Sequence, residues 1–156
     1  MRENIQIPSS NIQSITNKYN SNMRSGFLNV DLEIESVAKL DLVAAEMGER
    51  VAVLYLGELG KSKRHLLALE ANRQFKSPDP VIHELCAVVA SLSPKAKRIW
   101  DSADKVFDVG YELRADEKRS QFKLRAGTLE RIAQLGASLT VTCYQREAPA
   151  KNSKPS

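Results

Sequence analysis

The sequence predicts an α+β protein built on a mixed sheet of about six strands, with its helices packed mainly on one face. Two observations predict this class. Apolar residues alternate with polar ones in several short segments, as in strands with one buried face, and recur at spacings of three and four in others, as in amphipathic helices. These segments follow one another in the order β-α-β-β-α-α-β-β-α-β.

Composition and charge predict one globular domain with two tails. Apolar residues make up 42% of the 156 residues and charged residues 27%, as in ordinary globular domains. We expect a single domain over residues 26–145, flanked by flexible tails at 1–25 and 146–156 that lack a regular period. Each tail carries two of the four net positive charges, so the domain between them is neutral. This distribution argues against a surface built for nucleic acid.

The chain carries no sequence signal for a membrane or for secretion. No apolar stretch approaches the roughly 20 residues that a spanning helix needs, and the first 25 residues lack the apolar core of a signal peptide. We therefore expect a cytoplasmic protein. Cys86 and Cys143 lie in apolar segments and are expected to act as small core residues.

The first half of the domain is predicted to hold three strands and one helix. Residues 28–35 alternate apolar and acidic or amide side chains, the clearest strand pattern in the chain. Residues 37–47 have helical spacing, and Gly48 follows where a left-handed helix end would lie. Residues 51–59 are apolar on both faces, which is typical of an inner strand. The segment 61–75 has helical composition but strand-like alternation, and we interpret it as a strand.

Two helix starts follow. Asp79 precedes Pro80, and Ser93 precedes Pro94. In each pair the first side chain can accept hydrogen bonds from free amide groups, and proline is tolerated in the first helical turn. The wide apolar stripe after the first start, and the Ala, Ile and Trp residues after the second, predict a helical hairpin or a bent helix.

The last part of the domain is predicted to contain a hairpin, a helix and a final strand. Residues 107–113 alternate, and Phe122 with Leu124 provides a partner strand after a polar turn. Thr128 can cap the next helix, and residues 139–143 form the last strand. Because the strand–helix–strand units at both ends have short connections, their strands are expected to run parallel.

Acidic side chains form the main candidate site. Asp31, Glu33 and Glu35 lie on one side of one strand, about 6.6 Å apart in succession, and Asp108 and Glu112 are expected to join them. Carboxylates this close could hold Mg²⁺ or Ca²⁺ or act as an acid/base pair, and they also suit a solvated sheet face. We predict these five residues as the partner-binding surface.

Two other motifs are incomplete. Gly60 with the Lys-Ser that follows matches the end of a phosphate-binding loop, but Tyr55 stands where the motif needs its other glycine, so we expect a plain turn. His83, Cys86 and Cys143 could supply three metal ligands, but a fourth is missing. We expect a core thiol at Cys86 and a surface imidazole at His83, and we predict no catalytic residue, metal site or cofactor.

One resemblance bears on function. Trp100, the strand Phe107–Tyr111 and the run TLERIAQLGASLTVTCY at 128–144 resemble uncharacterised bacterial proteins that are classified only as domains of unknown function. The similarity covers roughly residues 27–145. Such small α+β domains are similar to immunity proteins, which block a toxin by covering its site, so the resemblance implies a protein partner.

The sequence therefore leaves three functional hypotheses. The first is a non-catalytic protein-binding module, an immunity-type inhibitor of a bacterial toxin that uses an exposed sheet face or strand edge. The second is a nucleic-acid-associated protein that uses the basic tails with Lys61, Lys63 and Arg64. The third is a metal-dependent hydrolase on the acidic strand. We expect the first, with no membrane partner, and the oligomeric state is left open.

Overall fold

The computed structural model describes residues 26–146. Its strands are β1 (Gly26–Ser36), β2 (Val51–Glu58), β3 (His65–Ala71), β4 (Asp104–Arg114) and β5 (Ser138–Arg146). Its helices are α2 (Asp41–Met47), α3 (Pro78–Ala90), α4 (Pro94–Ser102) and α5 (Ala126–Gln134), with 3-10 turns η1 (Gly48–Arg50) and η2 (Gly60–Ser62). The expected tails at 1–25 and 147–156 lie outside the described residues, whereas Arg146, assigned by sequence to a tail, ends β5.

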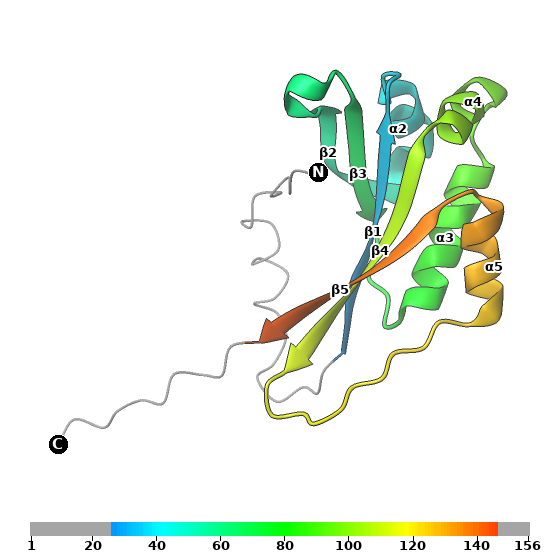
Figure 1. The fold of residues 1–156 in the computed structure, drawn as a ribbon. Helices are drawn as coiled ribbons and strands as arrows, with labels where there is room; N and C mark the ends of the chain where they lie inside the picture. Colours follow the sequence, from blue (N-terminus) through cyan, green and yellow to red (C-terminus); the bar gives the residue numbers. More distant parts are fainter. Residues whose placement is uncertain (1–25, 147–156) are drawn as a thin grey trace.

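The described strands form one mixed five-stranded sheet in the order β2-β3-β1-β4-β5. Every neighbouring pair is antiparallel except β4 and β5, which are parallel. All four described helices lie on one face of this sheet (Figure 1). The predicted α+β class and mixed sheet are therefore confirmed. None of the described helices combines the length and apolar character that crossing a bilayer requires.

The two strand–helix–strand units differ in their pairing. β4 and β5 are parallel neighbours joined through α5, as expected. β1 and β2 also point the same way, but β3 lies between them and is antiparallel to both. Because β3 follows β2 through the short turn η2, the tight β2–β3 hairpin forms, and it is β3 that reaches β1.

The predicted strand at Phe122 and Leu124 is wrong. Residues 115–125 form a loop, so the described sheet has five strands instead of about six. The ring of Phe122 stacks on Tyr111 with centroids 3.7 Å apart, and Leu124 packs against the core. β5 takes the place beside β4 that this strand was expected to fill.

The core lies between the sheet and the helices. Trp100 is fully buried, and its indole N–H donates to the carbonyl of Leu135 at 3.3 Å. Tyr111 is also buried, so both aromatic side chains pack in the core. The strands contribute the buried side chains that alternate along their helix-facing sides, chiefly Val30, Leu32, Ile34, Leu67, Leu69, Phe107 and Val109.

The helix starts are only partly as predicted. The hydroxyl of Ser93 accepts from the amide of Ala96 at 3.3 Å, which confirms the cap of α4. Asp79 does not cap α3, because that helix begins one residue earlier. Its carboxylate accepts from the Arg125 amide and the Thr128 hydroxyl, so it holds the start of α5. Thr128 is likewise not a cap, since α5 begins two residues before it.

Two strand predictions have opposite outcomes. The strand interpretation of residues 61–75 is confirmed by β3. The prediction of an inner strand at 51–59 is wrong, because β2 is an edge strand with Val53, Tyr55 and Leu56 at least 40% exposed. The helix expected over residues 37–47 begins at Asp41 and ends before Gly48, which adopts a positive φ of 61° as expected.

Candidate functional site: the acidic face of the sheet

The sheet face opposite the helices, here called the acidic face, collects carboxylates from three neighbouring strands. Alternation along each strand places these side chains outside because the residues between them enter the core. The acidic residues of this face are Asp31, Glu33 and Glu35 from β1, Glu70 from β3, and Asp104, Asp108 and Glu112 from β4. All of them are at least partly exposed.

The centre of the acidic face is a row of three carboxylates. Asp31 lies directly opposite Glu70 of β3 on one side and Asp108 of β4 on the other. Directly opposed residues have Cβ atoms about 5 Å apart, a separation at which like charges destabilise a sheet. We call Glu70, Asp31 and Asp108 the carboxylate row.

Asp31, Glu33 and Glu70 hold protons more tightly than isolated carboxylates do. Burial raises the pKa of Asp31 from 3.8 to about 7, with further contributions from the charges of Glu70, Asp108 and Glu33. Burial also raises the pKa of Glu33 and of Glu70. The charged form is penalised because partial desolvation and like charges act in the same direction. A cation placed against the row would relieve both effects and release a proton.

The ends of the acidic face are neutralised, whereas its centre is not. Arg64 Nε lies 2.5 Å from Glu35, too poorly aligned for a hydrogen bond, and its Nη2 donates to Asp104 at 2.8 Å. At the other end, Arg146 lies 3.7 Å from Glu112. No cation among the described residues pairs with Glu33 or with the carboxylate row. The unbalanced negative charge is thus concentrated at the middle of the sheet.

Neutral hydrogen bonds orient two carboxylates of the row. The Asn29 amide donates to Asp31 at 2.9 Å, and the Thr142 hydroxyl lies 2.8 and 2.9 Å from the two oxygens of Asp108. Gly110 makes room for this arrangement, since a methyl group there would collide with the side-chain oxygen of Asn29. The absence of a side chain at Gly110 therefore leaves space for the Asn29 side chain that orients Asp31.

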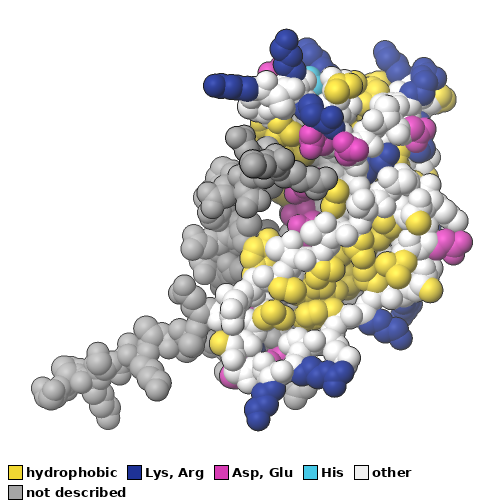
Figure 2. Space-filling model, in the orientation of Figure 1, with side chains coloured by type: hydrophobic (Ala, Val, Ile, Leu, Met, Phe, Trp, Pro, Cys, Tyr) yellow, Lys and Arg dark blue, Asp and Glu magenta, His cyan; other side chains and the backbone are white. Residues whose placement is uncertain are grey.

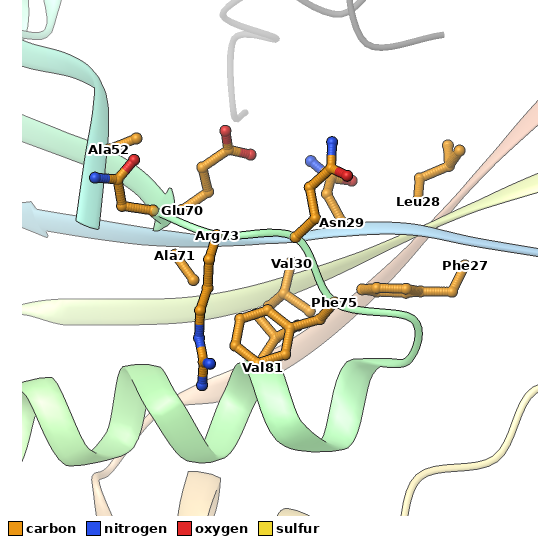
Figure 3. A pocket seen from close by; sticks show the side chains of 12 residues that line it. Phe27, Leu28, Asn29, Val30, Ala52, Glu70, Ala71, Arg73, Phe75 and Val81 are labelled. Atoms are coloured by element: carbon orange, nitrogen blue, oxygen red, sulfur yellow. The ribbon is translucent and has the colours of Figure 1, made fainter. Parts of the chain in front are cut away.

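A pocket of about 290 Å³ opens at one end of the row (Figure 3). Pairing between β1 and β3 ends at Asp31 and Glu70, so the first residues of β1 pair with β4 but have no strand on their other side. Figure 3 shows Glu70 and Asn29 on one side of β1, with Phe27, Phe75 and Val81 on the side of α3. The pocket thus combines an apolar wall with Glu70 and with Arg73, whose guanidinium lies 4.5 Å from the centre of the Phe75 ring.

All five sequence-predicted site residues lie on the acidic face, but they are not equivalent. Asp31, Glu33 and Asp108 form its unpaired centre, while Glu35 and Glu112 are engaged in ion pairs. Sequence reasoning missed Glu70. The alternation of β3 would have placed it outside the core, but its position opposite Asp31 depends on the β1–β3 register.

The metal-ligand and phosphate-loop residues lie elsewhere. His83 is half-buried, contrary to the expected surface imidazole, and its Nε2 lies 3.1 Å from the fully buried Thr128 hydroxyl. Cys86 is buried as expected, whereas Cys143 is exposed. Residues 26–146 contain no group of three or more His, Cys, Asp or Glu side chains arranged to hold a metal ion. Gly60 begins the turn η2 between β2 and β3, as expected.

The comparisons with known proteins add no relative. A scan against protein-family models, a search of curated proteins and a search of solved structures each found no match.

Proposed function

We propose that this chain is a non-catalytic protein-binding module whose acidic face binds a cationic segment of a partner protein, as an immunity-type inhibitor binds a toxin. One observation carries the proposal: the carboxylate row and Glu33 form a cluster of carboxyl groups with which no described lysine or arginine pairs. Lysine or arginine side chains of a partner would supply the missing charge.

The arrangement suits an extended or helical protein segment. The row crosses three strands, and the pocket beside Glu70 adds an apolar wall for the stem of a lysine or arginine side chain. The same charge repels phosphate, which argues against nucleic acid on this face. Arg64, one of the residues considered for nucleic acid, is already paired with acidic neighbours. A cytoplasmic partner, such as the product of a neighbouring gene, is part of this proposal.

Binding of a cation should release protons at neutral pH. The pKa of Asp31 stands at about 7 through burial and its acidic neighbours, so much of this carboxyl is protonated when nothing is bound. An ammonium or guanidinium group against the row favours the charged form and lowers that pKa. Titration calorimetry in two buffers of different ionisation enthalpy measures this release directly.

The test uses a short peptide of alternating lysine and serine as the probe, with the full chain. The double variant Asp31→Asn, Glu33→Gln is expected to weaken binding at least about tenfold and to abolish the proton release. The matched control Glu49→Gln, Glu130→Gln removes the same charge from exposed sites outside the acidic face and is expected to bind like the wild type.

Two results would overturn the proposal. One is equal binding by both double variants, which would mean that net charge alone attracts the peptide. The other is a wild-type chain that binds neither the peptide nor the neighbouring gene product. Tight, steeply salt-dependent binding of DNA or RNA by the same chain would favour the nucleic-acid hypothesis instead.

A further inference from the structure

The two edges of the sheet are built differently. β2 is interrupted by an irregularity between Val53 and Tyr55, contains Gly57 and ends in Glu58. Bulges and charges of this kind are how natural proteins prevent an edge strand from pairing with another chain. β5, the opposite edge, has no register shift and no glycine, and its one charged residue, Arg146, lies at its end.

β5 is open to pairing along its length. Its register with β4 continues without a shift from Ser138 to Arg146, and no described strand lies on its outer side. From Ser138 to Gln145 the strand contains no charged residue, no proline and no glycine. An unpaired, regular and uncharged edge presents free backbone donors and acceptors to a further strand.

The side of β5 that faces the helices is also incompletely covered. Val141 is 51% exposed, Leu129 of α5 is 45% exposed, and Cys143 is exposed. Figure 2 shows hydrophobic side chains gathered into a patch beside β5. Patches of this kind on a folded chain commonly mark an interface.

We propose that two copies of this chain form a symmetric dimer in which β5 pairs antiparallel with β5 of the second copy, centred on Val141. A two-fold axis perpendicular to the sheet keeps each side chain on its own face and lets one surface be its own complement. Centred on Val141, the pairing sets Val141 against Val141 and Leu139 against Cys143, and on the other face Thr140 against Thr142.

The sequence of β5 selects a second copy as the occupant. In this register every apolar residue on the helix side meets an apolar residue, and threonines meet across the other face, a favourable cross-strand pair. Moving the centre by one residue to Thr142 would set Leu139 against Gln145. Arg146, the one charged residue of β5, lies at the end of the strand and opposes residue 136, beyond the partner strand.

The dimer joins the two sheets edge to edge, with both acidic faces on the same side. It leaves the carboxylate row uncovered, so it goes beyond the proposed binding function and does not depend on it. A cationic partner would meet two copies of the row on one continuous sheet, which favours partners with two basic segments.

The test measures the oligomeric state of the full chain by light scattering and sedimentation, without any partner. We expect the wild type to be a dimer and Val141→Lys to raise the dimer dissociation constant at least about tenfold, because two ammonium groups would then face each other. Val53→Lys changes a comparably exposed valine on the opposite edge and should leave the dimer intact. Circular dichroism checks that both variants remain folded.

The register is tested by cross-linking. Val141→Cys in a Cys143→Ser background should form a symmetric disulfide-linked dimer under mild oxidation, because the two introduced thiols face each other across the axis. A monomeric wild type up to about 0.2 mM would overturn the proposal. So would a dimer that survives Val141→Lys, a dimer lost with Val53→Lys, or an edge that pairs only with a strand of a different protein.

Discussion

Replacing Asp31 by asparagine removes the central charge of the carboxylate row and preserves the shape of the side chain. The amide oxygen of the new residue can still accept the hydrogen bond from Asn29, which spans 2.9 Å in the wild type. The substitution therefore isolates the electrostatic cost of keeping Asp31 charged between Glu70 and Asp108.

The size and the sign of the effect follow from the pKa of Asp31. This pKa is about 7 in the folded protein against an ordinary value of 3.8. The folded state consequently binds the proton more tightly, and the wild type loses stability as pH rises from about 4 through about 7. At about 1.4 kcal/mol per pKa unit the full loss would be roughly 4 kcal/mol. Since Asp31 is only partly buried and salt screens its neighbours, we expect Asp31→Asn to gain about 2 kcal/mol at pH 8.

The assay is urea denaturation followed by the fluorescence of Trp100, the single tryptophan of the chain, at several values between about pH 4.5 and 8.5. The stability of Asp31→Asn should approach that of the wild type at the acid end and exceed it at the alkaline end. Glu49→Gln, an exposed carboxylate on the turn η1, should stay within about 0.5 kcal/mol of the wild type throughout.

The reasoning would be refuted if Asp31→Asn were less stable than the wild type at pH 8. A gain of the same size at every pH would also refute it, because the stabilisation would then come from packing and not from the removal of a charge.

Three further substitutions test the packing around the site and the helices. Gly110→Ala should cost about 1 kcal/mol, because its methyl group displaces the Asn29 side chain from its hydrogen bond with Asp31. In a double-mutant cycle the same change should cost little in the background of Asn29→Ala, and additive losses would contradict the contact. Asp79→Ala should cost about 1–2 kcal/mol in thermal denaturation, because it removes the carboxylate that accepts from both the Thr128 hydroxyl and the Arg125 amide; an unchanged midpoint would argue against this link between α3 and α5. Ser93→Ala should cost about 1–2 kcal/mol by urea denaturation, because it removes both the cap of α4 and the hydrogen bond from the Ser93 hydroxyl to Glu46; a neutral result would show that neither contact adds stability.

The alternation of β1 and β4 predicted much of the candidate site. Asp31, Glu33 and Asp108 had to leave the core once their apolar neighbours entered it, because successive side chains of a strand point to opposite faces. The start of α4 at Ser93 was equally local, since a cap depends on residues a few positions apart.

The errors share a different origin. The apolar run of β2 predicted an inner strand, yet β2 lies at an edge because β3 occupies the place beside β1. Phe122 was predicted to lie in a strand, but its ring stacks on Tyr111 from a loop. Asp79 was predicted to cap its own helix, but it holds the start of α5. In each case a partner remote in sequence decided the outcome.

The sequence by itself determined which side of each strand is acidic and which is apolar, because that depends only on the period of the chain. The tertiary structure alone decided that β3 and β4 flank β1, that Glu70 and Asp108 face Asp31, and that β5 is left at the edge. The order and register of strands come from packing between segments far apart in the chain, and no local pattern encodes them.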